Sequence, residues 1–456
     1  MPENFAVMNL SAEKPGIWQR SPIIRFFRWL FTWRTIRRCI LSVACLTAFI
    51  TLFYIEENWR GRRAWENYRR EWEAKGERFE MADFIPPPVP DDQNFAMTPF
   101  LAILFDYEID LDRDFEDPKF FSRRDPRAYE QLNRRLKSLS LQEPSKGYKA
   151  YRKHPSLGDW REGQSIDLKQ WQSYFRGSTH FPVAPQLQGS AKDILHALEK
   201  FDEELNEIST AVRRPYSQFA IHYDEGDFAS CQHWSVLRDL VEIYRLRASA
   251  RLALGKRNLG LDDIETCFRL AESIKGEPLL DSHFQRRSMT NLALQPVWEG
   301  LMNHQWSNPH LSRIERQLKA VNFLDGYLHA SRGSRAWMNQ TMFLPLRTRF
   351  MYASIFSDSR IQRDSFFRGG RVFLHLLLHP KGWRYAGLKE ANQYYQEKIL
   401  PTVDSSKQRV DQNAIEELDL LRNSQSSPPV VIWTDHFCHS VKGLAIGAAV
   451  AQTDVN

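Results

Sequence analysis

The sequence predicts a mainly α-helical protein, with one N-terminal transmembrane helix followed by a soluble body of helix hairpins. An uncharged stretch of about seventeen residues, CILSVACLTAFITLFYI, runs from Cys39 to Ile55. Between residues 190 and 330, apolar residues recur in steps of three and four, as they do on one face of a helix. An aromatic content of 13% with only 21 glycines favours a folded body over a disordered one.

The uncharged stretch 39–55 has the properties of a membrane anchor. As a helix it is roughly 25 Å long, which is the short end of what crosses a hydrocarbon core. Aromatic residues that suit the two membrane interfaces flank it: Trp29, Trp33, Phe53, Tyr54 and Trp59. A buried core helix would normally carry a polar stripe, and a cleavable signal peptide would be followed by small residues instead of Tyr54-Ile-Glu-Glu57. We therefore expect a retained transmembrane helix.

The basic residues are concentrated ahead of this helix. The net charge is +6, and residues 1–38 hold seven Lys and Arg against two Glu, so the rest of the chain is close to neutral. This distribution argues against nucleic-acid binding and predicts a juxtamembrane segment that contacts anionic lipid headgroups. The arginines nearest the membrane are Arg25, Arg28, Arg34, Arg37 and Arg38. The positive-inside rule then places the N-terminus in the cytoplasm and the body outside, most simply at a bacterial inner membrane.

Residues 56–76 are expected to continue the same helix as a stalk. Trp65, Tyr68 and Trp72 follow at i, i+3 and i+7, on one face, and Gly76 is a natural stop. That aromatic face packs on the protein's own body or on headgroups, or else it binds a partner. Residues 77–94 contain Pro-Pro-Pro-Val-Pro and are expected to form an extended, proline-rich spacer.

The remaining chain divides into an irregular part with short helices, 95–190, and an α-helical body, 191–456. Helical spacing runs from Trp234 to a stop around Gly255, and again from Leu261 to Gly276. This pair is loosely similar to a tetratricopeptide unit, although a generic helix hairpin explains the same residues. Asn308 with Pro309 has the pattern of a further helix start.

Few residues carry recognisable chemistry. Asp435, His436, Cys438 and His439 are four potential metal ligands in one short segment, and no second Cys/His group accompanies them. His375 and His379 stand four apart, but leucines replace the Glu that a zinc protease would place between them. The chain has no Gly-rich phosphate loop and no nucleophile elbow. No cofactor is predicted. The alternative hypothesis, that the protein is an enzyme, is that of a metal-dependent hydrolase which uses the 435–439 cluster.

Four stretches resemble a group of single-pass membrane proteins of verrucomicrobial and planctomycete-type bacteria that has no assigned activity. They are Trp59-Arg-Gly-Arg-Arg-Ala-Trp-Glu66, Phe84-Ile-Pro-Pro-Pro-Val-Pro-Asp-Asp-Gln-Asn-Phe-Ala96, Val297-Trp-Glu-Gly-Leu301 followed by Trp306, and His379-Pro-Lys-Gly-Trp383. The resemblance implies a single anchor and brings no catalytic residues. The leading hypothesis is therefore a membrane-anchored interaction or scaffold protein that faces the cell envelope and binds an unidentified protein partner.

Overall fold

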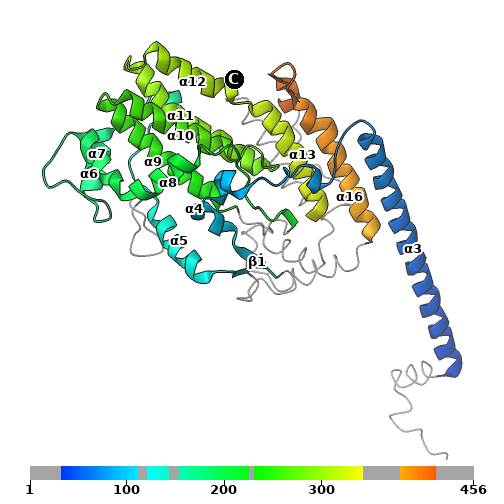
Figure 1. Cartoon of the computed structure of the whole chain (residues 1–456). Coiled ribbons are helices and arrows are strands. Elements are labelled where there is room, and N and C mark those ends of the chain that lie inside the picture. The colour runs from blue at the N-terminus through cyan, green and yellow to red at the C-terminus, as the bar shows by residue number, and fades with distance from the viewer. Residues whose placement is uncertain (1–31, 111–120, 143–153, 225–230, 342–379, 417–456) are drawn as a thin grey trace, which may run out of the picture. The chain divides into compact units, whose positions relative to one another are not determined.

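The computed structural model describes residues 32–110, 121–142, 154–224, 231–341 and 380–416 (Figure 1). These residues are mostly helical, which confirms the predicted fold class in its main feature. The chain forms two compact units. One comprises the described parts of 1–65 together with 380–386, and the other comprises those of 66–379 and 387–456. Each unit is described by itself below.

The helices have these bounds: α3 Trp33–Glu73, α4 Pro99–Ala102, α5 Pro126–Ser138, α6 Leu168–Arg176, α7 Ser190–Leu198, α8 Asp202–Ala211, α9 His233–Ala253, α10 Arg257–Glu272, α11 Leu280–Met302, α12 Asn308–Ala320, α13 Phe323–Thr341 and α16 Lys381–Tyr394. Helix α16 continues into a π-helical turn, η9, at Tyr395–Ile399. The strands form two short antiparallel pairs: β1 Tyr107–Ile109 with β2 Phe121–Arg123, and β3 Val403–Asp404 with β4 Arg409–Val410.

Helix α3 contains both the predicted membrane segment and the predicted stalk in 41 continuous residues. It ends near Gly76, which adopts a φ of +94°. The Glu77 amide donates to the Trp72 carbonyl at 3.0 Å, so the reversed chain satisfies a terminal carbonyl of the helix. The apolar segment and the first residues after it thus belong to one helix, which ends at Glu73, three residues before Gly76.

Helices α9, α10 and α11 lie against one another and form the centre of the larger unit (Figure 1). Tyr244 and Ala248 of α9 and Phe268 and Ala271 of α10 are all buried, as their helical spacing predicted. Gly255, with a φ of +70°, ends α9 where expected. Helix α10 begins at Arg257 instead of after Gly260, because Gly260 lies inside its first turn against Leu252.

Two helix starts differ in detail from the sequence pattern. Ser307, not Asn308, caps α12, and its hydroxyl and amide pair with the His310 ring in a capping box. Helices α7 and α8 lie in the region of helical apolar spacing and are separated by a 3₁₀ turn at Glu199–Phe201. A separate apolar cluster joins α13 with η9 and the β3–β4 hairpin.

The proline-rich segment is hydrogen-bonded to the chain ahead of α9. The Gln218 side-chain amide donates to the Pro86 carbonyl at 2.8 Å. Asn94 is held from both sides, because its side-chain amide donates to the Gln218 carbonyl at 2.9 Å and its side-chain oxygen accepts from the Gln218 amide at 2.8 Å. These bonds fix residues 86–94 as one wall of a cleft.

Candidate functional site

The first candidate site is the apolar surface of α3. An 18-residue window of this helix is long and apolar enough to cross a membrane, and 0% of it is buried. Leu46 is 59% exposed and Phe49 is 69% exposed. Nine large apolar side chains share this exposure: Ile40, Leu41, Val43, Leu46, Phe49, Ile50, Leu52, Phe53 and Ile55. A surface of this size and continuity marks an interaction with a membrane or a partner.

Immediately beyond this surface, the start of α16 packs on α3. We call the contact between residues 57–61 and residues 380–384 the α3–α16 junction. The Trp383 indole donates to Glu57 Oε2 at 2.8 Å, and the Gly382 amide donates to Asn58 Oδ1 at 2.8 Å. A methyl group built on Gly61 would overlap the Gly382 carbonyl, and one built on Gly382 would overlap the Glu57 carbonyl. The two backbones therefore touch because both positions are glycine.

Glu57 is the polar centre of the junction. Its other carboxylate oxygen accepts from Arg60 at 2.5 Å. The hydrogen bond from Arg60 lowers the pKa of Glu57 below its ordinary value, and the Trp383 bond acts in the same direction against the effect of burial. Glu57 thus stays ionised with both oxygens occupied, and it orients the indole of Trp383.

A second candidate site is a cleft of about 250 Å³ in the larger unit. Its apolar walls come from Ile85, Pro86, Pro88, Val89, Met97, Phe219, Ala220 and Ile221, and its polar groups include Asn94, Gln218, Tyr223 and Glu277. Glu277 accepts from His233 Nε2 at 2.8 Å, from the Trp234 indole at 3.0 Å and from the Ser282 hydroxyl. The His233 ring stacks on Phe219 with centroids 4.3 Å apart.

The polar groups at this cleft are not arranged to activate a nucleophile. Ser282 donates to Glu277 and not to His233, so the three residues do not have the serine–histidine–carboxylate order of a hydrolase triad. Burial, and then the charge of Glu277, raises the pKa of Cys231 and of Tyr223. The Cys231 thiol is therefore protonated at neutral pH and is a poor nucleophile.

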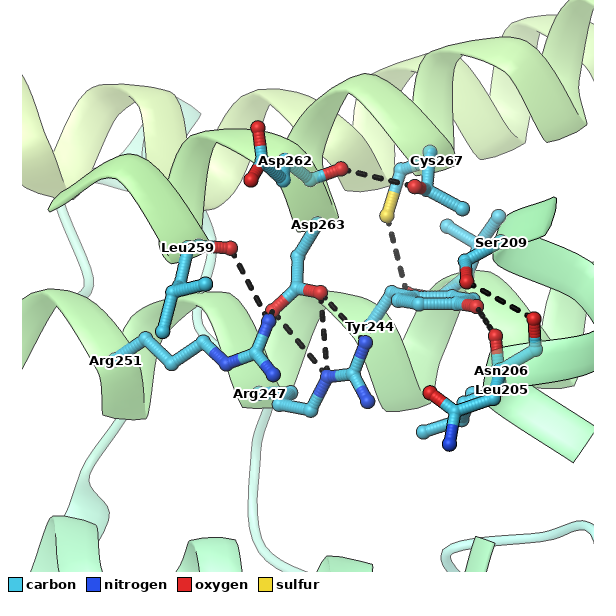
Figure 2. A network of polar contacts seen from close by, with 12 residues as sticks. Leu205, Asn206, Ser209, Tyr244, Arg247, Arg251, Leu259, Asp262, Asp263 and Cys267 are labelled. Carbon is cyan, nitrogen blue, oxygen red and sulfur yellow. Dashed lines mark hydrogen bonds and ion pairs between the residues drawn. The ribbon is translucent and has the colours of Figure 1, made fainter. Parts of the chain in front are cut away.

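A buried ion-pair network lies between α9 and α10 (Figure 2). Arg247 and Arg251 both reach Asp263 at 2.7 Å, and Arg247 makes a second contact with the same carboxylate at 3.2 Å. Burial raises the pKa of Asp263, and the two guanidinium groups act in the opposite direction. Tyr244 adds a hydrogen bond from its hydroxyl to the Leu205 carbonyl at 2.6 Å. The network joins the two helices of the hairpin.

The metal-ligand candidates Asp435, His436, Cys438 and His439 lie outside the described residues, as do His375 and His379. Within the part of the chain that the structure describes, no group of three or more His, Cys, Asp or Glu is placed to hold a metal. The α3–α16 junction and the cleft depend chiefly on Gly382 and Glu277, to which sequence reasoning assigned no role. The sequence signals for the junction were the stretches Trp59-Arg-Gly-Arg-Arg-Ala-Trp-Glu66 and His379-Pro-Lys-Gly-Trp383.

Comparisons with known proteins found no match for this chain. No family model matches the chain, and no curated protein or solved structure matches it.

Proposed function

We propose that this chain is a membrane-anchored helical interaction protein, inserted in a bacterial inner membrane with its N-terminus in the cytoplasm and its body in the cell envelope. The observation that carries the proposal is the apolar window of α3, of which 0% is buried. A core helix of a soluble protein would cover such a face with its own body.

The energetics favour a lipid environment for this segment. Removing one large apolar side chain from water is worth about 1.5–3 kcal/mol, so the nine exposed apolar side chains together favour transfer by on the order of 10 kcal/mol or more. The backbone costs little extra in lipid, because every amide of the helix interior is bonded within the helix. Insertion is the simplest way to cover this surface.

The orientation rests on basic residues. Arg34, Arg37 and Arg38 precede the apolar window on α3, and the predicted headgroup contacts continue to Arg28 and Arg25. Arg60, Arg62 and Arg63 follow it but alternate with Glu56, Glu57 and Glu66. More arginines precede the apolar window than follow it in this comparison. The positive-inside rule therefore favours a cytoplasmic N-terminus.

The body supports the interaction part of the proposal. Helices α9 and α10 form a hairpin that packs on α11, and Tyr244, Ala248, Phe268 and Ala271 are buried in it. Stacked helix hairpins build extended surfaces that bind other proteins. The partner in this proposal is accordingly a protein in the envelope.

Membrane extraction tests the anchor. We expect the full-length chain to stay in the membrane pellet after alkaline carbonate treatment and to dissolve only in detergent. Leu46→Arg with Phe49→Arg should release it, because each arginine at the centre of a span costs about 2.5–3.5 kcal/mol. Leu46→Ile is the matched control and should remain in the pellet. A soluble wild-type chain with an intact N-terminus would contradict the anchor, and a mature chain starting after residue 55 would show a cleaved signal instead.

A further inference from the structure

We propose that the α3–α16 junction is a binding surface for anionic phospholipid headgroups of the leaflet nearest the body. The inference rests on the proposed function, because it takes α3 to span the membrane. The inference goes beyond the proposed function because it assigns a lipid contact to a second segment, residues 381–384, which lies some 320 residues along the chain from the anchor.

The first step is the position of the junction along the helix axis. The apolar segment ends at Ile55, and the junction residues Glu57 to Gly61 follow within six residues. At 1.5 Å per residue they lie about 3–9 Å past the end of the hydrocarbon core. The headgroup layer extends roughly 5–8 Å beyond that core on each side. The turn of α3 that holds α16 is therefore at headgroup depth.

The second step is that α16 is attached closely enough to share this depth. The Gly382 amide lies 2.8 Å from Asn58 Oδ1, and the Trp383 indole nitrogen lies 2.8 Å from Glu57 Oε2. The backbone contact between Gly61 and Gly382 leaves no room for a side chain between the helices. Lys381, Trp383 and Arg384 consequently start α16 at the level of Glu57 to Gly61.

The third step is charge. Residues 56–63 and 381–386 together carry five basic side chains and two acidic ones, a net charge of +3. One of the two acids, Glu57, is already hydrogen-bonded by Arg60 and Trp383. Lys381 is exposed, and the Arg60 side chain is 64% exposed. A surface with this balance attracts anionic headgroups, with each basic residue worth about fivefold in affinity.

The fourth step is the presence of two indoles at the same level. Trp59 is 59% exposed and Trp383 is 37% exposed. Arg63 lies over the Trp59 ring at 5.2 Å from its centroid. Tryptophan with adjacent arginine is the side-chain combination that membrane proteins concentrate at the interface, where a ring sits among headgroups and a guanidinium bonds phosphate.

Photo-crosslinking from the full-length protein in vesicles tests this assignment. Benzoylphenylalanine is placed at Ala386, an exposed position three residues after Trp383 on α16, or at Leu46 in the apolar window. The vesicles contain phosphatidylcholine with a minor fraction of phosphatidylglycerol, and lipid adducts are identified by mass spectrometry. We expect Leu46 adducts in the bulk lipid ratio and Ala386 adducts enriched in phosphatidylglycerol.

Charge variants give the specificity. Lys381→Gln should lower the phosphatidylglycerol enrichment at Ala386 roughly fivefold, and Lys381→Gln with Arg384→Gln should lower it further. Lys192→Gln with Arg213→Gln removes the same charge from exposed positions of the larger unit and should leave the enrichment unchanged. Lipid adducts at Leu46 with none at Ala386, or Ala386 adducts in the bulk ratio, would overturn the headgroup surface alone. Adducts at neither position would overturn the membrane anchor itself.

Discussion

Arg335 of α13 and Glu77, four residues past the end of α3, form an ion pair at 2.9 Å in which the arginine side chain is 0% exposed. Arg335 also donates to the Arg78 carbonyl at 2.7 Å and to Gln396 Oε1 at 2.7 Å, and its guanidinium lies over the Phe79 ring. Arg332 binds the same carboxylate at 3.0 Å. The chain that leaves α3 is thus bound to α13 through the Glu77 carboxylate, the Arg78 carbonyl and the Phe79 ring.

Glu77→Ala should be strongly destabilising, because it leaves the buried Arg335 charge without its counterion. We expect a loss of about 3–5 kcal/mol in the free energy of unfolding. Denaturant titration of the full chain in mild detergent, followed by circular dichroism, measures it. Glu80→Ala is the matched control, since the Glu80 side chain is 60% exposed in its pair with Arg69 and should cost under about 1 kcal/mol. Equal losses for the two variants would contradict the role of Glu77.

Asp263→Asn should weaken the α9–α10 hairpin for a similar reason. It removes the shared counterion of Arg247 and Arg251 in a buried site (Figure 2). The expected cost is about 3–5 kcal/mol. The adjacent Asp262 pairs with Arg313 at the surface and is 49% exposed, so Asp262→Asn should cost about 1 kcal/mol or less. The difference between these neighbouring substitutions in one denaturation series is the measurement.

The contrast between α9 and α11 shows what the sequence made predictable. Tyr244 and Ala248 are buried and follow helical spacing, whereas Arg238 on the same helix is exposed. This pattern of apolar and polar residues predicted both α9 and its end. Helix α11 packs on α9, α10 and α13 and buries Met289, Ala293 and Val297 together with polar residues, so no polar face marks it. Its buried Gln295 and Glu299, four residues apart on one face of the helix, are bonded to each other at 2.9 Å.

The junction and the cleft were less predictable than the helices, because they join distant segments. The apolar window of α3 is local and could be found from composition. Gly61 and Gly382 give no local sign of their contact, which depends on how two segments about 320 residues apart meet. Glu277 lines the same cleft as the proline-rich segment, which Gln218 binds from more than 100 residues along the chain.

Gly61→Ala should open the α3–α16 junction, since the new methyl group would overlap the Gly382 carbonyl. We expect loss of the Trp383–Glu57 hydrogen bond and faster proteolysis near residue 380, with the helical content of the rest unchanged. Limited proteolysis in detergent, read by mass spectrometry, reports this. Gly276→Ala is the control, because a methyl group there meets only Pro86 at 3.7 Å. Identical cleavage patterns for the two variants would argue against a glycine-dependent contact.

Asp239 should make stability depend on pH. Burial raises the pKa of Asp239 from 3.8 to about 7, and the charge of Glu242 adds to the effect. The unfolded chain loses this proton near pH 4 while the folded chain keeps it, so the free energy of unfolding should fall between pH 4 and 7 and then level off. Asp239→Asn should gain about 1–2 kcal/mol at pH 8 and nothing near pH 4, allowing for the partial exposure of the side chain. A gain that is the same at both pH values would instead indicate a packing effect.

Topology is the prediction that decides which compartment supplies the partner. An alkaline phosphatase fusion after Lys75 should be active and a green fluorescent protein fusion at the same site dark, because the arginines before the span keep the N-terminus in the cytoplasm. Replacing Arg34, Arg37 and Arg38 by Gln should lower phosphatase activity, since Arg20, Arg25 and Arg28 would then no longer outnumber Arg60, Arg62 and Arg63 across the span. Replacing Arg60, Arg62 and Arg63 instead is the matched control and should keep the phosphatase fusion active. A fluorescent fusion in the wild type would place the body in the cytoplasm and move the search for its protein partner there.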